Sequence, residues 1–268
     1  MKPYHNYLNT SAFLVLMAVM FTACKKNKSN NIIEEVFLPK TITVSNHINP
    51  TMNGTIELTY NTDRQISSIK RVSAASEFTL TYSYDAQKKH TKTSLNKKLS
   101  TGYSFQYDYN FEYTNAIPTK AIVISTDESG SYTDETTITH VQQTNRFGLW
   151  STNYLFTADL DLTSGTGSIY DGWGLAATYS TNNGVFTHLV KLPSTSFFLS
   201  KADFPDLLLM AKKELKTLTI NGHPSEASSG EYNNITIQRD AQNRISRYII
   251  KNDTKTYAQF DIAYITVQ

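Results

Sequence analysis

Polar and aromatic residues alternate without interruption from Tyr103 to Tyr113. Every odd-numbered position in this stretch is aromatic and every even-numbered position is polar. Successive side chains of a β-strand point to opposite faces, so the pattern predicts one aromatic face and one polar face. At about 3.4 Å per residue such a strand would be about 37 Å long and would need equally long neighbours. The stretch therefore predicts an extended antiparallel sheet, buried on one face and solvated on the other.

A unit of strand, turn and strand recurs around this stretch. Residues 56–67 and 235–246 match position for position, with Asn61 and Asp240 each followed by Gln or Arg, Ile and Ser at the same spacing. Residues 84–87 repeat part of the unit, and residues 111–120 are a looser copy. Asn or Asp at such a position predicts an Asx-type turn and therefore a repeated hairpin. Stacked hairpins form a β-meander, which must curl or close to protect its edges.

One segment departs from the strand pattern. Residues 203–216 begin with acids and Pro205 and end with lysines, a polarity that matches the helix macrodipole. Its apolar residues predict a helix packed on the sheet or plugging one end of the roll. Further strands are expected at residues 78–84, 121–124, 132–141, 154–162 and 185–190. The fold predicted is all-β: a long-stranded antiparallel meander, rolled or closed into a barrel-like sheet, with one helix near residues 203–216.

The N-terminus has the pattern of a targeting signal. Basic residues precede an apolar run at residues 12–21, which is too short for a transmembrane helix and has the length of a signal-peptide core. The run ends at Cys24, the one cysteine of the chain. Small residues followed by Cys resemble the lipobox of bacterial lipoproteins, which implies that Cys24 is lipidated and becomes the mature N-terminus. The alternative is an ordinary cleaved signal in which Cys24 is incidental.

These features predict three parts: a lipoprotein signal peptide at residues 1–23, a flexible polar tether at 24–34, and a single β-rich domain at 35–268. The Cys-Lys-Lys start and the hairpin unit together resemble a family of Bacteroidetes lipoproteins, whose common domain has unknown function and a porin-like β-fold. The units also resemble the YD repeats of Rhs-type proteins. The resemblance implies an all-β roll anchored by lipid in the outer membrane, and it assigns no catalytic residue. Which face of that membrane carries the chain stays open.

Composition and motifs narrow the function classes. The formal charge is +2 and the basic residues are spread along the chain, so no nucleic-acid partner is expected. The histidines show no metal-ligand spacing, and no phosphate loop or nucleophile elbow is present, so neither a metal nor a cofactor is expected. Asp159 and Asp161 would share one strand face, as paired glycosidase carboxylates might, although an ordinary solvated strand face is favoured. A cluster of acids near one hairpin end could hold Ca²⁺, although a solvated charged tip is favoured: Asp127, Glu128, Asp134 and Glu135.

Aromatic residues supply the best candidate for ligand binding. Trp173 lies in a Gly-flanked turn, and an exposed ring beside a carboxylate suits stacking on a sugar. The candidate ligand-binding residues are Trp150, Tyr170, Asp171 and Trp173. The alternative is that both tryptophans are buried in the core. The function predicted is a lipid-anchored cell-envelope lipoprotein, a non-catalytic binding or structural module whose partner is a glycan or an envelope protein. The alternatives are a carbohydrate-binding protein of the outer membrane and, less favoured, a hydrolase.

Overall fold

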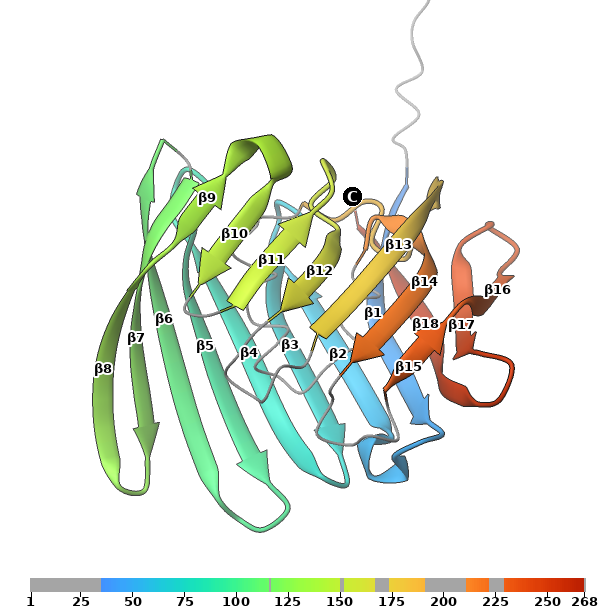
Figure 1. Cartoon of the computed structure of the whole chain (residues 1–268), viewed down its shortest axis with the longest axis horizontal. Helices are drawn as coiled ribbons and strands as arrows, with labels where there is room; N and C mark the ends of the chain where they lie inside the picture. Colours follow the sequence, from blue (N-terminus) through green and yellow to red (C-terminus); the bar gives the residue numbers. More distant parts are fainter. Residues whose placement is uncertain are drawn as a thin grey trace, which may run out of the picture. The chain divides into compact units, whose positions relative to one another are not determined.

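The computed structural model describes residues 35–115, 117–149, 152–166, 174–190, 211–221 and 229–267. Residues Val36–Val267 form one compact unit. The strands that the structure describes make two antiparallel sheets (Figure 1). Among the described residues the helical segments are two short 3-10 turns, η1 (Pro50–Met52) and η2 (Gln142–Thr144). None of the described helices has the length and apolar character needed to cross a lipid bilayer.

The first sheet has eleven strands, and nearly all of its neighbours are consecutive in the chain. The exception is the pairing of the first strand with the last, which joins the two ends of the meander. In spatial order the strands are β16 (Asn234–Arg239), β17 (Ile245–Lys251), β18 (Thr256–Val267), β1 (Val36–Asn46), β2 (Gly54–Tyr60), β3 (Ile66–Ser73), β4 (Ser76–Tyr84), β5 (His90–Leu99), β6 (Ser104–Thr114), β7 (Ile117–Asp127) and β8 (Gly130–Thr137).

The second sheet has seven strands among the described residues. The chain passes from the first sheet into the second after β8 and returns to the first sheet at β16. Within the described ranges neither sheet closes on itself, so the expected barrel-like closure is unconfirmed, whereas the all-β antiparallel meander is confirmed. The strands in spatial order are β15 (Gly230–Tyr232), β14 (Lys213–Asn221), β13 (Gly174–Asn183), β12 (Leu162–Thr166), β11 (Thr152–Phe156), β10 (Arg146–Leu149) and β9 (Thr139–Val141).

The predicted aromatic strand is β6, and its alternation sets the two faces of the first sheet. Tyr109 and Phe111 are buried, whereas Phe105 and Tyr107 are half-buried and Tyr103, just before the strand, is exposed. The rings of consecutive inward residues follow one another, with 5.4 Å between the centroids of Phe105 and Tyr107. The aromatic face is therefore fully covered only at Tyr109 and Phe111, and Tyr113 near the end of the strand is again half-buried.

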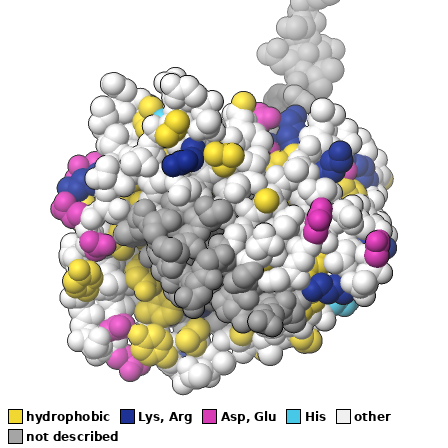
Figure 2. All heavy atoms as spheres, viewed as in Figure 1, with side chains coloured by type: hydrophobic (Ala, Val, Ile, Leu, Met, Phe, Trp, Pro, Cys, Tyr) yellow, Lys and Arg dark blue, Asp and Glu magenta, His cyan; other side chains and the backbone are white. Residues whose placement is uncertain are grey.

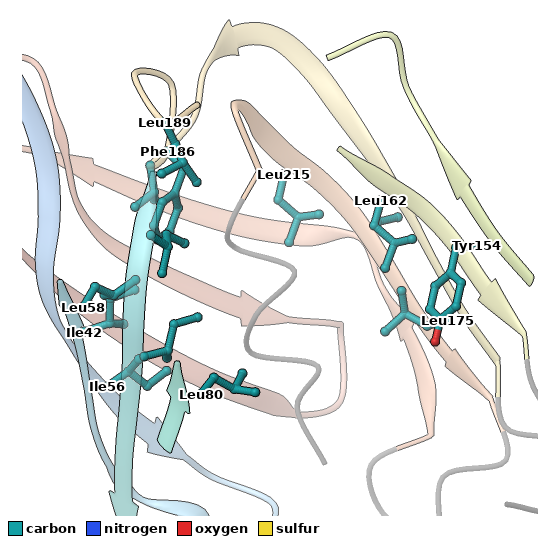
Figure 3. Packing of buried hydrophobic residues seen from close by; sticks show 14 of the residues in the cluster. Ile42, Ile56, Leu58, Leu80, Tyr154, Leu162, Leu175, Phe186, Leu189 and Leu215 are labelled. Carbon is teal, nitrogen blue, oxygen red and sulfur yellow. The ribbon is translucent and has the colours of Figure 1, made fainter. Parts of the chain in front are cut away.

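Apolar side chains of both sheets meet in a common core (Figure 3). With the single cysteine at position 24, Val36–Val267 contains no disulfide, and burial of these side chains is the main stabilising term. The turn after β13 adds the buried Phe186 and Leu189 to this core. The residues that point toward one another in Figure 3 include Ile42, Ile56, Leu58 and Leu80 of the first sheet, and Tyr154, Leu162, Leu175 and Leu215 of the second.

The repeated hairpin unit is a five-residue turn with the same hydrogen bonds in each copy. In Asn61–Gln65, Asp85–Lys89 and Asp240–Arg244, the first side chain accepts hydrogen bonds from the backbone N–H groups of the third and fifth residues. This confirms the predicted Asx-type turns. The fourth residue of each copy has φ between 61° and 63°, a left-handed conformation that the turn enforces on a non-glycine residue: Arg64, Lys88 and Asn243.

The predicted helix is wrong where the structure can test it. Residues 213–216 belong to β14, and residues 203–210 lie outside the described residues. The pairing of β14 with β13 skips Lys216, which bulges out of the ladder. The bulge leaves the buried Leu215 and Leu218 three positions apart, and this spacing imitates a helical stripe.

Three predicted strands also differ from the structure. Residues 154–162 are interrupted by a turn at Thr157–Asp161, closed by the Thr157 N–H donating to the Asp161 carbonyl. Residues 185–188 form a turn, because Val185, Phe186 and Leu189 are all buried and alternation is lost. Residues 132–141 divide into β8 and β9, which belong to different sheets.

Candidate functional site

A polar pocket of about 630 Å³ lies beside the turn between β16 and β17. One wall is this turn, and the other is the end of β13 with the turn that follows it. Phe37 of β1 and Tyr264 of β18 contribute aromatic rings to the lining. The pocket volume lies within the range of about 300–1,000 Å³ that is usual for small-ligand sites.

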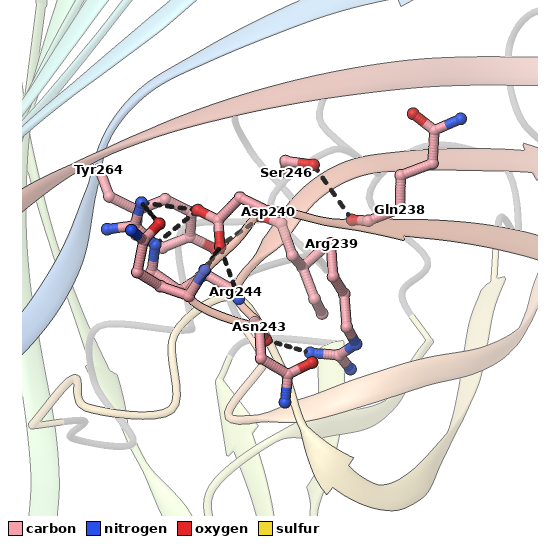
Figure 4. Close-up of polar contacts among 9 residues, drawn as sticks. Gln238, Arg239, Asp240, Asn243, Arg244, Ser246 and Tyr264 are labelled. Atoms are coloured by element: carbon pink, nitrogen blue, oxygen red, sulfur yellow. Dashed lines mark hydrogen bonds and ion pairs between the residues drawn. The ribbon is translucent and has the colours of Figure 1, made fainter.

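Arg244 of the pocket lining is held by an aspartate and two aromatic rings. Its Nε donates to Asp240 Oδ2 at 2.6 Å, and its Nη2 also lies 2.6 Å from that oxygen (Figure 4). The guanidinium is 4.4 Å from the ring centroid of Phe37 and 5.0 Å from that of Tyr264. A planar cation held in this way has lost its freedom before a ligand arrives, which favours binding.

Asp240 is the carboxylate behind this arginine. Partial burial alone would raise its pKa, but hydrogen bonds from the Arg244 backbone N–H and guanidinium and from the Gln242 N–H hold the pKa of Asp240 below its usual value. The ion pair therefore persists at every pH above the ordinary titration range of aspartate. Because Gln242 Oε1 also accepts from Arg244 Nη2 at 3.2 Å, the turn residues fix the guanidinium from one side.

Arg239 is the second cation of the lining. Its Nη1 donates to the Asn243 carbonyl at 2.9 Å (Figure 4). Its Nη2 lies 3.6 Å from Glu214 Oε2. Glu214 is held in turn by the hydroxyl of Ser180 at 3.2 Å. Arg239 and Arg244 thus line the pocket, whereas their carboxylate partners are not among the lining residues.

The facing wall is rich in amide and hydroxyl groups. Asn182, Asn183 and His188 are exposed in it. The wall is fixed to the start of β14 by Gly184, whose N–H donates to the Lys212 carbonyl at 2.7 Å. A Cβ at Gly184 would lie 2.5 Å from a backbone oxygen, so only glycine fits this approach. Guanidinium and amide donors facing one space suit a small ligand that carries hydroxyl and carboxylate oxygens.

The predicted lipidation site and the candidate ligand-binding residues lie outside the described residues: Cys24, Trp150, Tyr170, Asp171 and Trp173. Their roles therefore stay predictions. Sequence reasoning missed the pocket, because its walls come from segments about fifty residues apart. The one local signal was the pair of arginines that flank the turn, Arg239 and Arg244. The same pattern is also typical of an ordinary charged surface loop.

The carboxylate pair expected on one strand face is wrong. Asp159 is exposed in the turn, whereas Asp161 is fully buried and accepts hydrogen bonds from the backbone N–H groups of Lys212 at 2.7 Å and Lys213 at 2.9 Å. Two backbone donors occupy the oxygens that hydrolysis would require. Asp161 is thus a structural residue that fastens the turn to β14.

The acidic hairpin end has its own partners. Asp127 accepts from the backbone and hydroxyl of Ser129, and Glu135 lies 2.7 Å from Lys120. Over the described part of the chain, no group of three or more His, Cys, Asp and Glu side chains could hold a metal ion. On the face drawn in Figure 2, the described acidic and basic side chains are interspersed rather than gathered by sign.

Comparisons with known proteins give similarity at the level of solved structures. No family model matches the chain, and no curated protein matches it. A porin-like protein from Bacteroides uniformis is 12% identical, with 85% of this chain and 97% of that chain covered and a TM-score of 0.39. A porin-like protein from Bacteroides vulgatus is 13% identical, with 86% and 99% covered and the same TM-score. The chain is therefore similar to porin-like proteins from Bacteroides, at a level that carries no argument about its site or activity.

Proposed function

We propose that this chain is a lipid-anchored, non-catalytic binding protein of the cell envelope that holds a small sugar acid in the pocket beside the β16–β17 turn. The observation that carries the proposal is Arg244, fixed by Asp240 and by the rings of Phe37 and Tyr264 while it faces the pocket. A carboxylate is the group that a fixed guanidinium binds best.

The rest of the lining favours a sugar acid over a simple anion. The amides of Asn182, Asn183 and Gln242 can each donate and accept, as vicinal hydroxyls require. Arg244 occupies one face of the Phe37 ring and one face of the Tyr264 ring, so the sugar would be held by hydrogen bonds rather than by stacking on those faces. Carbohydrate binding through Trp150, Tyr170, Asp171 and Trp173 stays a separate prediction.

Isothermal titration calorimetry tests the pocket with glucuronate and galacturonate against glucose and galactose. We expect the full chain, purified in detergent, to bind at least one acid and to bind the matching neutral sugar more weakly. Arg244→Met should reduce affinity for the acid at least tenfold, because a charge-assisted hydrogen bond is worth about 1.5–3 kcal/mol. Arg239→Met should weaken binding in the same direction.

The matched control is Arg247→Met. Arg247 lies three residues from Arg244 and is also paired with an aspartate, Asp261, but it does not line the pocket. Its replacement should leave affinity unchanged. Equal losses in the Arg244 and Arg247 variants, or equal affinity for acid and neutral sugar, would contradict the proposed site.

The membrane attachment rests on Cys24 and the apolar run before it. We expect cells that are fed labelled palmitate to label the wild-type chain and not the Cys24→Ser chain. We also expect the Cys24→Ser chain without residues 1–23 to be absent from the membrane fraction. A hydrophobic acyl chain contributes about 0.8 kcal/mol per buried CH₂, which is sufficient to make anchoring depend on this residue. Equal labelling of both proteins would refute lipidation at Cys24.

A further inference from the structure

We propose that a groove on the outer face of the first sheet binds an extended, uncharged polysaccharide chain that lies across strands β4 to β7. The groove has a volume of about 550 Å³ and is lined from all four strands and from the turn after β7. It is separate from the pocket beside the β16–β17 turn and shares no lining residue with it.

The lining side chains belong to the solvent face of the sheet. Thr79 and Asn96 lie next to the buried Phe78 and Lys97, and successive residues of a strand point to opposite faces. Gln106 of β6 likewise alternates with the inward aromatic residues of that strand. The floor of the groove is thus the sheet backbone, and its polar groups come from the outward residues.

Four of these outward residues stand in one row across the strands. Thr79 is opposite Asn96, Asn96 is opposite Gln106, and Gln106 is opposite Thr126. With strands about 4.8 Å apart, the row places a hydroxyl, two amides and a hydroxyl at regular intervals over about 14 Å. A polymer with regularly repeating hydroxyl groups is the ligand class whose donors and acceptors match such a row.

Neighbouring groups orient the row. Gln106 Nε2 donates to Asp108 Oδ2 at 3.1 Å, and Lys92 Nζ lies 3.2 Å from the same oxygen. The hydroxyl of Thr126 is 2.9 Å from that of Ser131. Side chains held in this way lose less freedom on binding, so hydrogen bonds to a ligand yield more affinity.

Charge decides which polymer fits. The row itself is uncharged, and Glu77, Asp127 and Glu128 lie at its margins with Lys98. Glu77 is already paired with Lys70 at 3.0 Å. An acidic polysaccharide or a nucleic acid would meet these carboxylates without an excess of basic groups. An uncharged polysaccharide meets no such repulsion, and it is the occupant to which the groove is assigned.

Native affinity electrophoresis of the full chain in detergent tests the assignment, with laminarin, xylan, starch and galactomannan cast in the gel and polygalacturonate as the acidic comparison. We expect at least one neutral polymer to retard the wild-type chain, and polygalacturonate to retard it less. Asn96→Ala combined with Gln106→Ala should weaken retardation by the neutral polymer at least tenfold in apparent affinity. Asn96→Asp, which keeps the size of the side chain, should weaken it as well.

The matched control is Asn110→Ala, because Asn110 lies on the same strand and face as Gln106 but outside the groove. It should retain wild-type retardation, as should Arg244→Met, which separates this site from the pocket. Circular dichroism melting checks that each variant is folded. The assignment is overturned if no neutral polymer retards the wild type, or if Asn110→Ala and the double variant lose retardation equally.

Discussion

Asp161→Ala is expected to lower the free energy of unfolding by about 3–5 kcal/mol, because the backbone N–H groups of the half-buried Lys212 and Lys213 lose their common acceptor. Each donor that is left without its acceptor costs about 1–3 kcal/mol, and two donors are affected. The carboxylate is fully buried and joins the β11–β12 turn to the first residue of β14. Urea unfolding followed by tryptophan fluorescence measures the change.

Asp159→Ala is the matched control, since the same residue type two positions earlier is exposed in the turn. It should change the free energy of unfolding by no more than about 0.5 kcal/mol. Asp161→Asn should fall between the two, because one of its amide atoms can accept and the other can only donate. If Asp161→Ala and Asp159→Ala were equally stable, the structural role of Asp161 would be refuted.

The parts of the fold that the sequence predicts are those in which local pattern and pairing agree. The stretch from Tyr103 to Tyr113 alternates perfectly and is found as β6, and the Asx turns recur because an Asn or Asp begins each one. The turn at Thr157–Asp161 was missed because Thr157 stands where the other copies have Asn or Asp, and Leu160 takes the left-handed position with φ of 61°. The backbone preferences of leucine do not predict a left-handed conformation at this position.

Long-range pairing explains the remaining differences. The bulge at Lys216 arises from the register of β14 against β13, which no local window contains. Division into two sheets depends on where β8 and β9 part, and no turn residue marks that point between Tyr132 and Val141. The pocket escaped prediction for the same reason: the local ion pair of Arg244 with Asp240 is completed by the rings of Phe37 and Tyr264, which come from other strands.

His90 should make the domain less stable as the pH falls from 7 to 4. Its ring is fully buried among Tyr82, Tyr84 and Phe111, with centroid distances of 5.0–5.7 Å. Burial lowers the pKa of His90 to about 4, despite the opposing hydrogen bond to the Lys92 carbonyl at 2.9 Å. In the unfolded chain the pKa of the histidine is near the ordinary value of about 6.5. Between this pH and pH 4 the unfolded chain therefore binds a proton that the folded chain does not bind.

The sign of the effect follows from this difference in bound protons. Stability is complete above the unfolded pKa, declines by about 1.4 kcal/mol per pH unit below it, and levels off near the folded pKa, for a loss of about 3 kcal/mol. Carboxylates with lowered pKa, such as Asp108 and Asp240, lose their stabilising contribution only at still lower pH and do so in any His90 variant.

Urea unfolding of the wild type and of His90→Gln, measured from pH 7.5 to pH 4, isolates the histidine. Glutamine keeps a side chain that can hydrogen-bond to the Lys92 carbonyl and the Thr93 hydroxyl, which lies 2.7 Å from His90 Nε2, but it cannot take up the proton. We expect the wild type to lose about 3 kcal/mol more than the variant between pH 6.5 and pH 4, so that the two curves converge in acid. Parallel curves would mean that His90 binds a proton equally well in the folded and unfolded chains, and its burial among the three rings would then have no effect on acid stability.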